Sequence, residues 1–340
     1  MVYSASNVVA LDDYNDSFYY VKRQSLFMIL GFVLMFIIMK INIEKIYKKI
    51  IYIFLFCLFI LILVLIPGIG VVRGGARSWI GIGSFSIQPS EFMKIGIILF
   101  IAKYLSDYYL DLKKIKYFIF LSLFVIIIFL LIMLQPDFGT GLVIVLSCFS
   151  FLYIGGANYK LFIIIGLIGL LGIIVLIISA PYRLERILAY LDPWSDPLGS
   201  GFQGIQSLFA ITPGGLFGYG FNKSIQKHFF LPEPQNDFIF AIIVEEFGLI
   251  GGAIVLLLYF LIIYRCFKIA KTIENNFCKF ILIGLSLTLS VQIFINVGVV
   301  IGLLPVTGIT LPLFSYGGSS LIINFISFGL ILNASKYQSV

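Results

Sequence analysis

Residues 117–134 read YFIFLSLFVIIIFLLIML, a run without a single charged side chain. A helix needs about 20 mostly apolar residues to cross the hydrocarbon core of a bilayer. Further segments of this kind occur along the whole chain. They are residues 25–41, 50–66, 92–105, 139–154, 161–179, 238–264, 280–302 and 321–332. The pattern predicts nine membrane-spanning helices, and the two shortest, 92–105 and 321–332, are expected to extend into their flanking residues.

The composition also indicates a protein that lies in a lipid bilayer. The chain has 340 residues, of which 61% are hydrophobic and 11% are charged, whereas a soluble domain carries about 25% charged residues. The predicted fold class is therefore an all-α integral membrane protein, a polytopic helical bundle that forms one membrane domain over residues 1–340. The four cysteines show no metal-ligand spacing and the chain has one histidine, so the sequence predicts no metal site.

The basic residues are distributed unevenly between the two sides of the predicted bundle. Fourteen of the 23 lysines and arginines fall on one side of the alternating loops, and these loops are short: Lys40, Lys45, Lys48, Lys49, Lys103, Lys113, Lys114, Lys116, Lys160, Arg265, Lys268, Lys271, Lys279 and Lys336. Short cytoplasmic loops carry an excess of Lys and Arg. This side is therefore predicted to face the cytoplasm, and the net charge of +7 requires no nucleic-acid partner.

This orientation places residues 1–24 outside the cell with no hydrophobic segment before them. We therefore expect the natural chain to begin further upstream, with one more helix of which residues 1–6 form the outer end. Three polar segments also fall on the outer side, at 67–88, 180–236 and 303–320. The segment 180–236, between the sixth and seventh spans, is too long for a simple connector and is predicted to be a structured external loop.

Residues 75–94, GARSWIGIGSFSIQPSEFMK, lie between the second and third spans. Pro89, Ser90 and Glu91 suit the first turn of a helix, where a carboxylate lies at the positive end of the helix dipole. Glu91 and Lys94 are three residues apart, which favours an ion pair within the helix.

The alternative interpretation of this region involves substrate. Arg73, Arg77 and Trp79 would lie at the membrane surface and meet an anionic, lipid-linked molecule. Arginine suits such a role because its planar guanidinium donates two hydrogen bonds to a phosphate at once. The spacing alone does not choose between an ion pair and a binding surface.

Two aspartates stand directly before apolar runs. Asp137, in QPDFGT (135–140), is predicted to cap a helix N-terminus. Asp237, in LPEPQNDFIFAIIVEEFG (231–248), is predicted at the outer mouth of the seventh span. A carboxylate in a partly dry pocket can accept a proton from a hydroxyl group, and helix capping is again the alternative.

Glu245 and Glu246 lie about two turns deeper in the same span. Glu245 or Glu246 is expected to face the interior of the bundle, because acids within a span are by default functional candidates. The last polar segment contains SYGGSS (315–320). Its Ser315, Gly317, Gly318 and Ser319 could form a backbone nest for an anion or a close contact between helices, and the spacing leaves both open.

Taken together, six ordered blocks resemble the SEDS family (shape, elongation, division and sporulation), the family of FtsW, RodA and SpoVE. The sequences of these blocks are most similar to those of the sporulation and division members. The blocks are GARSWIGIGSFSIQPSEFMK, QPDFGTG, DPWSDPLGSGFQGIQS, PGGLFGYGF, LPEPQNDFIFAIIVEEFG and LPVTGITLPLFSYGGSSL. They cover the chain from the first loop to the last span.

The resemblance implies a ten-helix peptidoglycan glycosyltransferase that polymerises lipid II at the outer face of the cytoplasmic membrane. The essential acid of the family falls on Asp237, the expected general base, and its conserved tryptophan falls on Trp79. Asn236 stands where the family commonly has threonine, and we expect this to tune the site. The predicted substrate-binding residues are Arg73, Arg77, Trp79, Gln88, Ser90, Glu91, Lys94, Glu245, Glu246, Ser315, Gly317, Gly318 and Ser319.

In this mechanism the pyrophosphate leaving group is stabilised by Arg73 or Arg77, or by a divalent cation, Mg²⁺ or Mn²⁺. The resemblance also implies a partner, a class B penicillin-binding transpeptidase, and a location at the division septum or in the forespore membrane. Two other functions stay open at this point. One is a lipid II flippase and the other is a non-catalytic scaffold for the transpeptidase.

Overall fold

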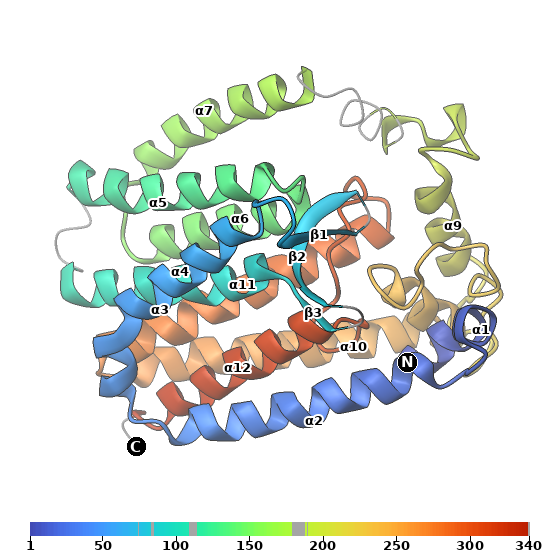
Figure 1. Ribbon diagram of the computed structural model, residues 1–340, viewed down its shortest axis with the longest axis horizontal. Coiled ribbons are helices and arrows are strands. Elements are labelled where there is room, and N and C mark those ends of the chain that lie inside the picture. Colours follow the sequence, from blue (N-terminus) through green and yellow to red (C-terminus); the bar gives the residue numbers. More distant parts are fainter. Residues whose placement is uncertain (74, 83–84, 109–113, 179–187, 189, 339–340) are drawn as a thin grey trace. The chain divides into compact units, whose positions relative to one another are not determined.

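A computed structural model describes residues 1–73, 75–82, 85–108, 114–178, 188 and 190–338. Among these residues, each of the nine predicted spans falls on one helix (Figure 1). The helices are α2 (Tyr19–Lys40), α3 (Ile43–Leu63), α4 (Pro89–Tyr108), α5 (Ile115–Met133), α6 (Phe138–Ile154), α7 (Tyr159–Ile178), α10 (Ile239–Thr272), α11 (Asn276–Val300) and α12 (Gly318–Ser335). The short third and last predicted spans are longer in the structure, as expected.

Six of the described helices, α2, α3, α5, α10, α11 and α12, are long and apolar enough to cross a membrane by length and composition. Two of the others depart from that standard for identifiable reasons, because α4 contains Glu91, Lys94 and Lys103 and α6 has 17 residues. The class of multi-pass helical membrane protein is thus confirmed. The number of nine spans stays a prediction.

The chain divides into two compact units. The first contains Met1–Leu26, Ile163–Leu261 and Gln292–Gly317, and the second contains Phe27–Phe162, Ile262–Val291 and Gly318–Val340. Each unit is considered by itself below.

The second unit is built around α4. This helix packs against α3, α5, α6 and α12 (Figure 1), and most of its residues are buried, including Met93, Ile97 and Leu105. Small residues permit the close contacts between helices. A Cβ on Gly329 of α12, for example, would lie 2.9 Å from the carbonyl oxygen of Met35.

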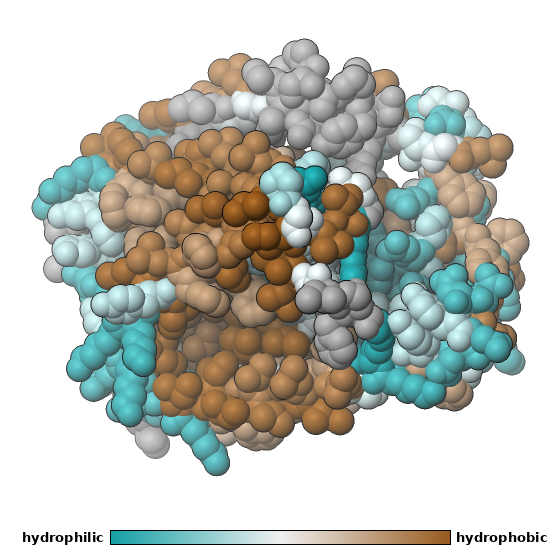
Figure 2. Space-filling view, viewed as in Figure 1, coloured by the Kyte–Doolittle hydropathy of each residue, from teal (hydrophilic) through white to brown (hydrophobic). Residues whose placement is uncertain are grey.

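Much of the outward surface of this unit is apolar. Figure 2 shows hydrophobic residues in brown over the helices of this region. Ile29, Phe56 and Phe59 are about 60% exposed, at 61%, 60% and 59%. Large apolar side chains in such numbers on a surface are expected where lipid, rather than water, is the solvent.

A three-stranded antiparallel sheet corrects the all-α prediction. Its strands are β1 (Gly70–Arg73), β2 (Ala76–Ile82) and β3 (Phe85–Ile87), in the order β1-β2-β3. The sequence predicts only a polar segment at 67–88, and its glycines are unusual in strands. Val71 nevertheless pairs with Trp79 in register, and Ile80 pairs with Ile87, so the β-branched and aromatic residues outweigh the glycines.

The first unit contains α1 (Val2–Tyr14), α7 from Ile163, the 3-10 helix η2 (Pro193–Ser195), α9 (Phe202–Ile211), α10 up to Leu261 and the end of α11. Residues 1–6, expected to be the outer end of an upstream helix, lie at the start of α1, which continues to Tyr14, and Ser4, Ala5 and Ser6 are buried. The predicted loop 180–236 is described from residue 188 onward except for 189, and η2 and α9 give it regular structure.

Candidate functional site

Asp237 lies at the start of α10, immediately before Phe238 and the first helical residue, Ile239. The side chain is half-exposed, whereas Phe238 and Ile239 are buried. The first helical hydrogen bonds run from the amides of Ala241 and Ile242 to the carbonyl of Phe238, at 2.9 and 3.4 Å. Only Phe238 therefore separates the aspartate from the first residue of α10.

The main chain around Asp237 is held from several directions. Asn296 of α11 donates from Nδ2 to the carbonyl oxygen of Asp237 at 2.7 Å. Two residues earlier, the carbonyl oxygen of Gln235 accepts from the amide of Tyr316 at 2.8 Å, and the amide of Asn236 donates to the carbonyl of Glu233 at 3.0 Å. The turn that carries the acid is thus fixed by its backbone.

The segment between α11 and α12 forms no helix or strand, and several of its carbonyls accept hydrogen bonds from polar side chains. Asn296 donates to the carbonyl of Ile309 at 2.7 Å, and Gln292 donates to that of Thr310 at 3.0 Å. The hydroxyl of Tyr259 donates to the carbonyl of Pro312. Backbone groups buried in a membrane protein need internal partners, and these side chains supply them.

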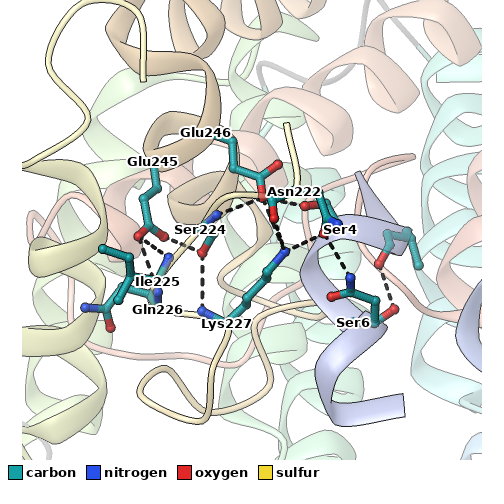
Figure 3. Close-up of polar contacts among 11 residues, drawn as sticks. Ser4, Ser6, Asn222, Ser224, Ile225, Gln226, Lys227, Glu245 and Glu246 are labelled. Carbon is teal, nitrogen blue, oxygen red and sulfur yellow. Dashed lines mark hydrogen bonds and ion pairs between the residues drawn. The ribbon is translucent and has the colours of Figure 1, made fainter. Parts of the chain in front are cut away.

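Glu245 and Glu246 are buried in the first unit, as predicted, with exposures of 1% and 0%. The carboxylate of Glu245 accepts from the hydroxyl of Ser224 at 2.5 Å and from the amides of Ile225 and Gln226 at 2.8 and 3.3 Å (Figure 3). Three donors from residues 224–226 thus bind one carboxylate. The loop before Asp237 is therefore anchored to the helix that follows Asp237.

Glu246 binds a second set of groups. Its carboxylate accepts from the hydroxyl of Ser4 on α1 and from the amide of Ser224, and it lies 3.9 Å from the ammonium of Lys227 (Figure 3). Lys227 is 2% exposed and also donates to the carbonyl of Asn222 at 2.8 Å. Burial lowers the pKa of Lys227, and the nearby Glu246 and then Glu245 oppose that shift.

α10 is broken just beyond these acids. Gly248 has φ 68° and ψ −171°, far from helical values. In a continuous helix the amides of Leu249 and Ile250 would bond to the carbonyls of Glu245 and Glu246. Here all four groups bond instead to residues 215–220, two as donors and two as acceptors, at 2.8–3.2 Å. The glycine-rich segment thereby replaces the hydrogen bonds that the helix loses.

The second unit holds another polar group, at the N-terminal ends of α4 and α6. Asp137 caps α6, accepting from the amide of Thr140 at 3.2 Å, so the capping prediction is confirmed. Its other carboxylate oxygen accepts from the Gln88 side chain at 2.8 Å and from the Ser90 hydroxyl at 3.4 Å. The amide of Gln88 in turn donates to the Ser319 hydroxyl at 3.1 Å.

The predicted ion pair between Glu91 and Lys94 is confirmed. The two groups are 2.8 Å apart, Glu91 in the first turn of α4 and Lys94 in the second, and both side chains are buried. The second carboxylate oxygen of Glu91 has no hydrogen-bond partner among the described residues. A buried carboxylate with one open oxygen can accept a further hydrogen bond.

Arg73, Arg77 and Trp79 lie on the sheet. The guanidinium of Arg73 lies over the Trp79 ring, 5.5 Å from its centroid, which is within the range of a cation–π contact. Arg73 is exposed, and Arg77 and Trp79 are half-buried. Arg77 and Trp79, two residues apart on β2, share one face of the strand. The three predicted residues therefore belong to one small surface.

Three backbone amides of the SYGGSS segment already bond to other groups of the protein. The amides of Ser315, Tyr316 and Gly317 bond to the carbonyl of Leu311, the carbonyl of Gln235 and the side chain of Gln24, at 3.0, 2.8 and 3.4 Å. A Cβ on Gly318 would lie 2.7 Å from the ring of Phe27. Close packing, rather than an anion nest formed by these three amides, is the interpretation that the structure favours.

A model of the FtsW/RodA/SpoVE family, described as "Cell cycle protein", matches residues 1–340. The chain belongs to the FtsW/RodA/SpoVE family. It is 50% identical over 341 residues to stage V sporulation protein E of Bacillus subtilis (strain 168), a match that covers 99% of this chain and 93% of that protein. It is 39% identical to the probable peptidoglycan glycosyltransferase FtsW of Geobacter sp. (strain M18), covering 98% and 92% of the two chains.

Solved structures resemble this FtsW/RodA/SpoVE family member over nearly its whole length. One is a chain from a structure described as "Structural coordination of polymerization and crosslinking by a peptidoglycan synthase complex", with a TM-score of 0.78, 32% identity and coverage of 98% and 94%. Another is the rod shape determining protein RodA of Thermus thermophilus, with a TM-score of 0.69, 28% identity and coverage of 99% and 94%.

Sequence reasoning missed several polar residues of this family member, among them Asn296, Gln292, Ser224 and Lys227. A signal for two of them was present. Gln292 and Asn296 are four residues apart in an apolar span, so their amides lie on one helix face, and polar side chains within a span need partners. The substrate-binding roles predicted for Glu245 and Glu246 stay predictions, since the contacts described above are with protein groups.

Proposed function

We propose that this chain is a peptidoglycan glycosyltransferase that polymerises lipid II into glycan strands at the outer face of the cytoplasmic membrane. One observation carries the proposal. A family member whose relatives include probable peptidoglycan glycosyltransferases holds a half-exposed aspartate, Asp237, on a fixed turn at the mouth of an apolar helix. A proton acceptor at the rim of a bundle suits a substrate whose lipid lies in the membrane and whose sugar lies outside.

Asp237 is the general base of the proposed reaction. Its carboxylate takes the proton from the 4-hydroxyl of the acceptor sugar while that oxygen attacks the anomeric carbon of the donor. The new glycosidic bond forms as the bond from the anomeric carbon to the pyrophosphate oxygen breaks, and undecaprenyl pyrophosphate leaves with the electron pair. Attack opposite the leaving group inverts the anomeric centre, and Asp237 then releases its proton to water.

Arg73 or Arg77 stabilises the negative charge of the departing pyrophosphate, because a guanidinium donates paired hydrogen bonds to phosphate oxygens. Trp79 and Arg73 together offer an apolar ring and a cation on one surface. Among the described residues no group of three or more His, Cys, Asp or Glu side chains could hold a metal ion. A Mg²⁺ or Mn²⁺ ion would therefore be held largely by the phosphate oxygens of the substrate.

The remaining predicted binding residues have several roles in this proposal. Gln88 and Ser90 orient the Asp137 carboxylate, and the open oxygen of Glu91 is available to a polar group of the substrate. In the first unit, Glu245, Glu246 and Ser315 support the loops that border Asp237. Gly318 allows the start of α12 to pack closely against Phe27, the amide of Gly317 bonds to Gln24, and Ser319 accepts from the amide of Gln88.

The proposed partner is a class B penicillin-binding transpeptidase, because a chain of a peptidoglycan synthase complex resembles this one over most of its length. The proposed site of action is the division septum or the forespore membrane, since the relatives include both a sporulation protein and FtsW proteins. The excess of lysines on one side of the predicted bundle supports an outward-facing Asp237.

Purified protein, reconstituted in vesicles with labelled lipid II and with the transpeptidase added, tests the proposal. Formation of polymer by the wild type, and its loss in Asp237→Ala, is the expected result. Movement of lipid II across the bilayer without polymer would identify a flippase instead, and neither activity would identify a scaffold.

A further inference from the structure

Asn296 lies near the end of α11, in a span that is otherwise rich in Ile and Val. Its side chain is 1% exposed. One nitrogen, Nδ2, donates at 2.7 Å to two carbonyls, that of Asp237 before α10 and that of Ile309 after α11. A single amide group thus ties together the two loops that meet beside the proposed base.

We propose that Asn296 is a positioning residue for Asp237: it fixes the carboxylate for proton transfer by holding the main chain of the same residue. This inference rests on the proposed function, in which Asp237 is the base. Asn296 itself contacts neither substrate nor the transferred proton.

The hydrogen bond from Asn296 lies where α10 begins. The first helical amides bond to the carbonyl of Phe238, and Asn296 holds the carbonyl one residue earlier, next to two buried residues. Replacing Asn296 removes this 2.7 Å bond. A shift of the peptide plane between Asp237 and Phe238 would displace the aspartate side chain.

General base catalysis is sensitive to such a change. A proton acceptor must lie within hydrogen-bond reach of the hydroxyl that it serves, and misplacement by about 1 Å can reduce a rate by about 100-fold. Binding of the lipid tail and of the distant parts of the substrate does not depend on this geometry. A positioning role therefore predicts a loss in kcat with little change in KM.

Gln292 provides the matched control within the same helix. It lies one turn earlier and donates its amide to the carbonyl of Thr310, the residue after Ile309. It supports the same segment through the carbonyl of Thr310 at 3.0 Å, whereas Asn296 bonds to the main chain of Asp237 as well. If Asn296 merely held that segment in place, replacing either residue would have the same effect.

The experiment compares Asn296→Leu with Gln292→Met, both nearly isosteric, in the full chain with its transpeptidase partner and labelled lipid II. We expect Asn296→Leu to lower kcat by about 10- to 100-fold with KM changed less than about threefold, and Gln292→Met to lower kcat by less than about threefold. The acid limb of the pH–rate profile, which reports the base, is expected to move in Asn296→Leu alone.

Equal losses in the two variants, or an unmoved acid limb in Asn296→Leu, would overturn the positioning role. If Asn296→Leu does not insert, Asn296→Gln replaces it, since the amide is then displaced by one methylene and the same loss in kcat is expected. Asp237→Asn tests the role of Asp237 as general base separately from its positioning by Asn296. If that variant is active, the proposed base is wrong; if it is inactive while Asn296→Leu behaves like Gln292→Met, only the positioning role is wrong.

Discussion

Gly218 lies directly against the main chain of Glu246. A Cβ at position 218 would be 2.3 Å from the carbonyl carbon of Glu246, and Gly218 has φ +70°. Both the space and the backbone angle therefore require glycine at this position. The contact brings residues 215–220 close enough to bond with the interrupted part of α10.

Gly218→Ala is expected to destabilise the protein. The left-handed conformation alone costs a side-chain-bearing residue about 1–2 kcal/mol, and the clash adds to it. Thermal unfolding in detergent measures the loss. Gly204→Ala is the control, because a Cβ there has nothing within 4 Å and the residue lies in α9. An unfolding temperature for Gly218→Ala equal to that of Gly204→Ala would contradict the contact.

Asp237→Asn is expected to reduce the rate of lipid II polymerisation by about 10²–10⁴-fold, the usual contribution of a general base. Amount in the membrane and unfolding temperature should stay close to those of the wild type, since the side chain is half-exposed. Asp12→Asn, on the exposed side of α1, is the control and should polymerise normally. Near-normal polymerisation by Asp237→Asn would exclude the proposed role.

The ion pair of Glu91 and Lys94 should respond differently to single and double replacement. Removing one partner of a buried pair leaves an uncompensated charge and costs about 3–5 kcal/mol. We therefore expect Lys94→Met alone to lower the unfolding temperature more than the double variant Glu91→Leu with Lys94→Met. A double variant that is less stable than Lys94→Met would show that the lone carboxylate is well solvated.

The lowered pKa of Lys227 predicts that the stability of the protein depends on pH. Burial lowers its pKa below the ordinary value of 10.5, so between the lowered value and 10.5 the unfolded chain binds more protons than the folded one. The contribution of this residue to stability should therefore rise as the pH is raised toward 10.5 and fall as the pH drops through the lowered pKa. Unfolding midpoints measured across this window should lose that component in Lys227→Met; identical slopes would contradict it.

Much of the fold followed from local patterns. Apolar runs predicted the helices because a span needs a long apolar stretch, and Pro89 and Asp137 marked helix starts through local chemistry. The sheet at 70–87 was missed because glycines interrupt its short strands, and pairing such as that of Val71 with Trp79 depends on the turn between them.

The sequence predicted the charged residues of the candidate site better than the polar residues that hold them through hydrogen bonds. Asp237, Glu91 and Lys94 were found because charges beside or within apolar segments are rare. Asn296 was missed because its partners, Asp237 and Ile309, are 59 and 13 residues away. The break at Gly248 was missed for the same reason, since its partners lie in residues 215–220.

The order of synthesis gives the break in α10 a further meaning. Residues 215–220 leave the ribosome before residues 245–250, so the partners for the four released main-chain groups already exist when the interrupted span emerges. The main-chain groups released at Gly248 can therefore find these partners as α10 is inserted, without waiting for a later part of the chain. If the glycine-rich segment were moved or deleted, these main-chain groups of α10 would lose those hydrogen-bond partners, and insertion of α10 into the membrane would become less favourable.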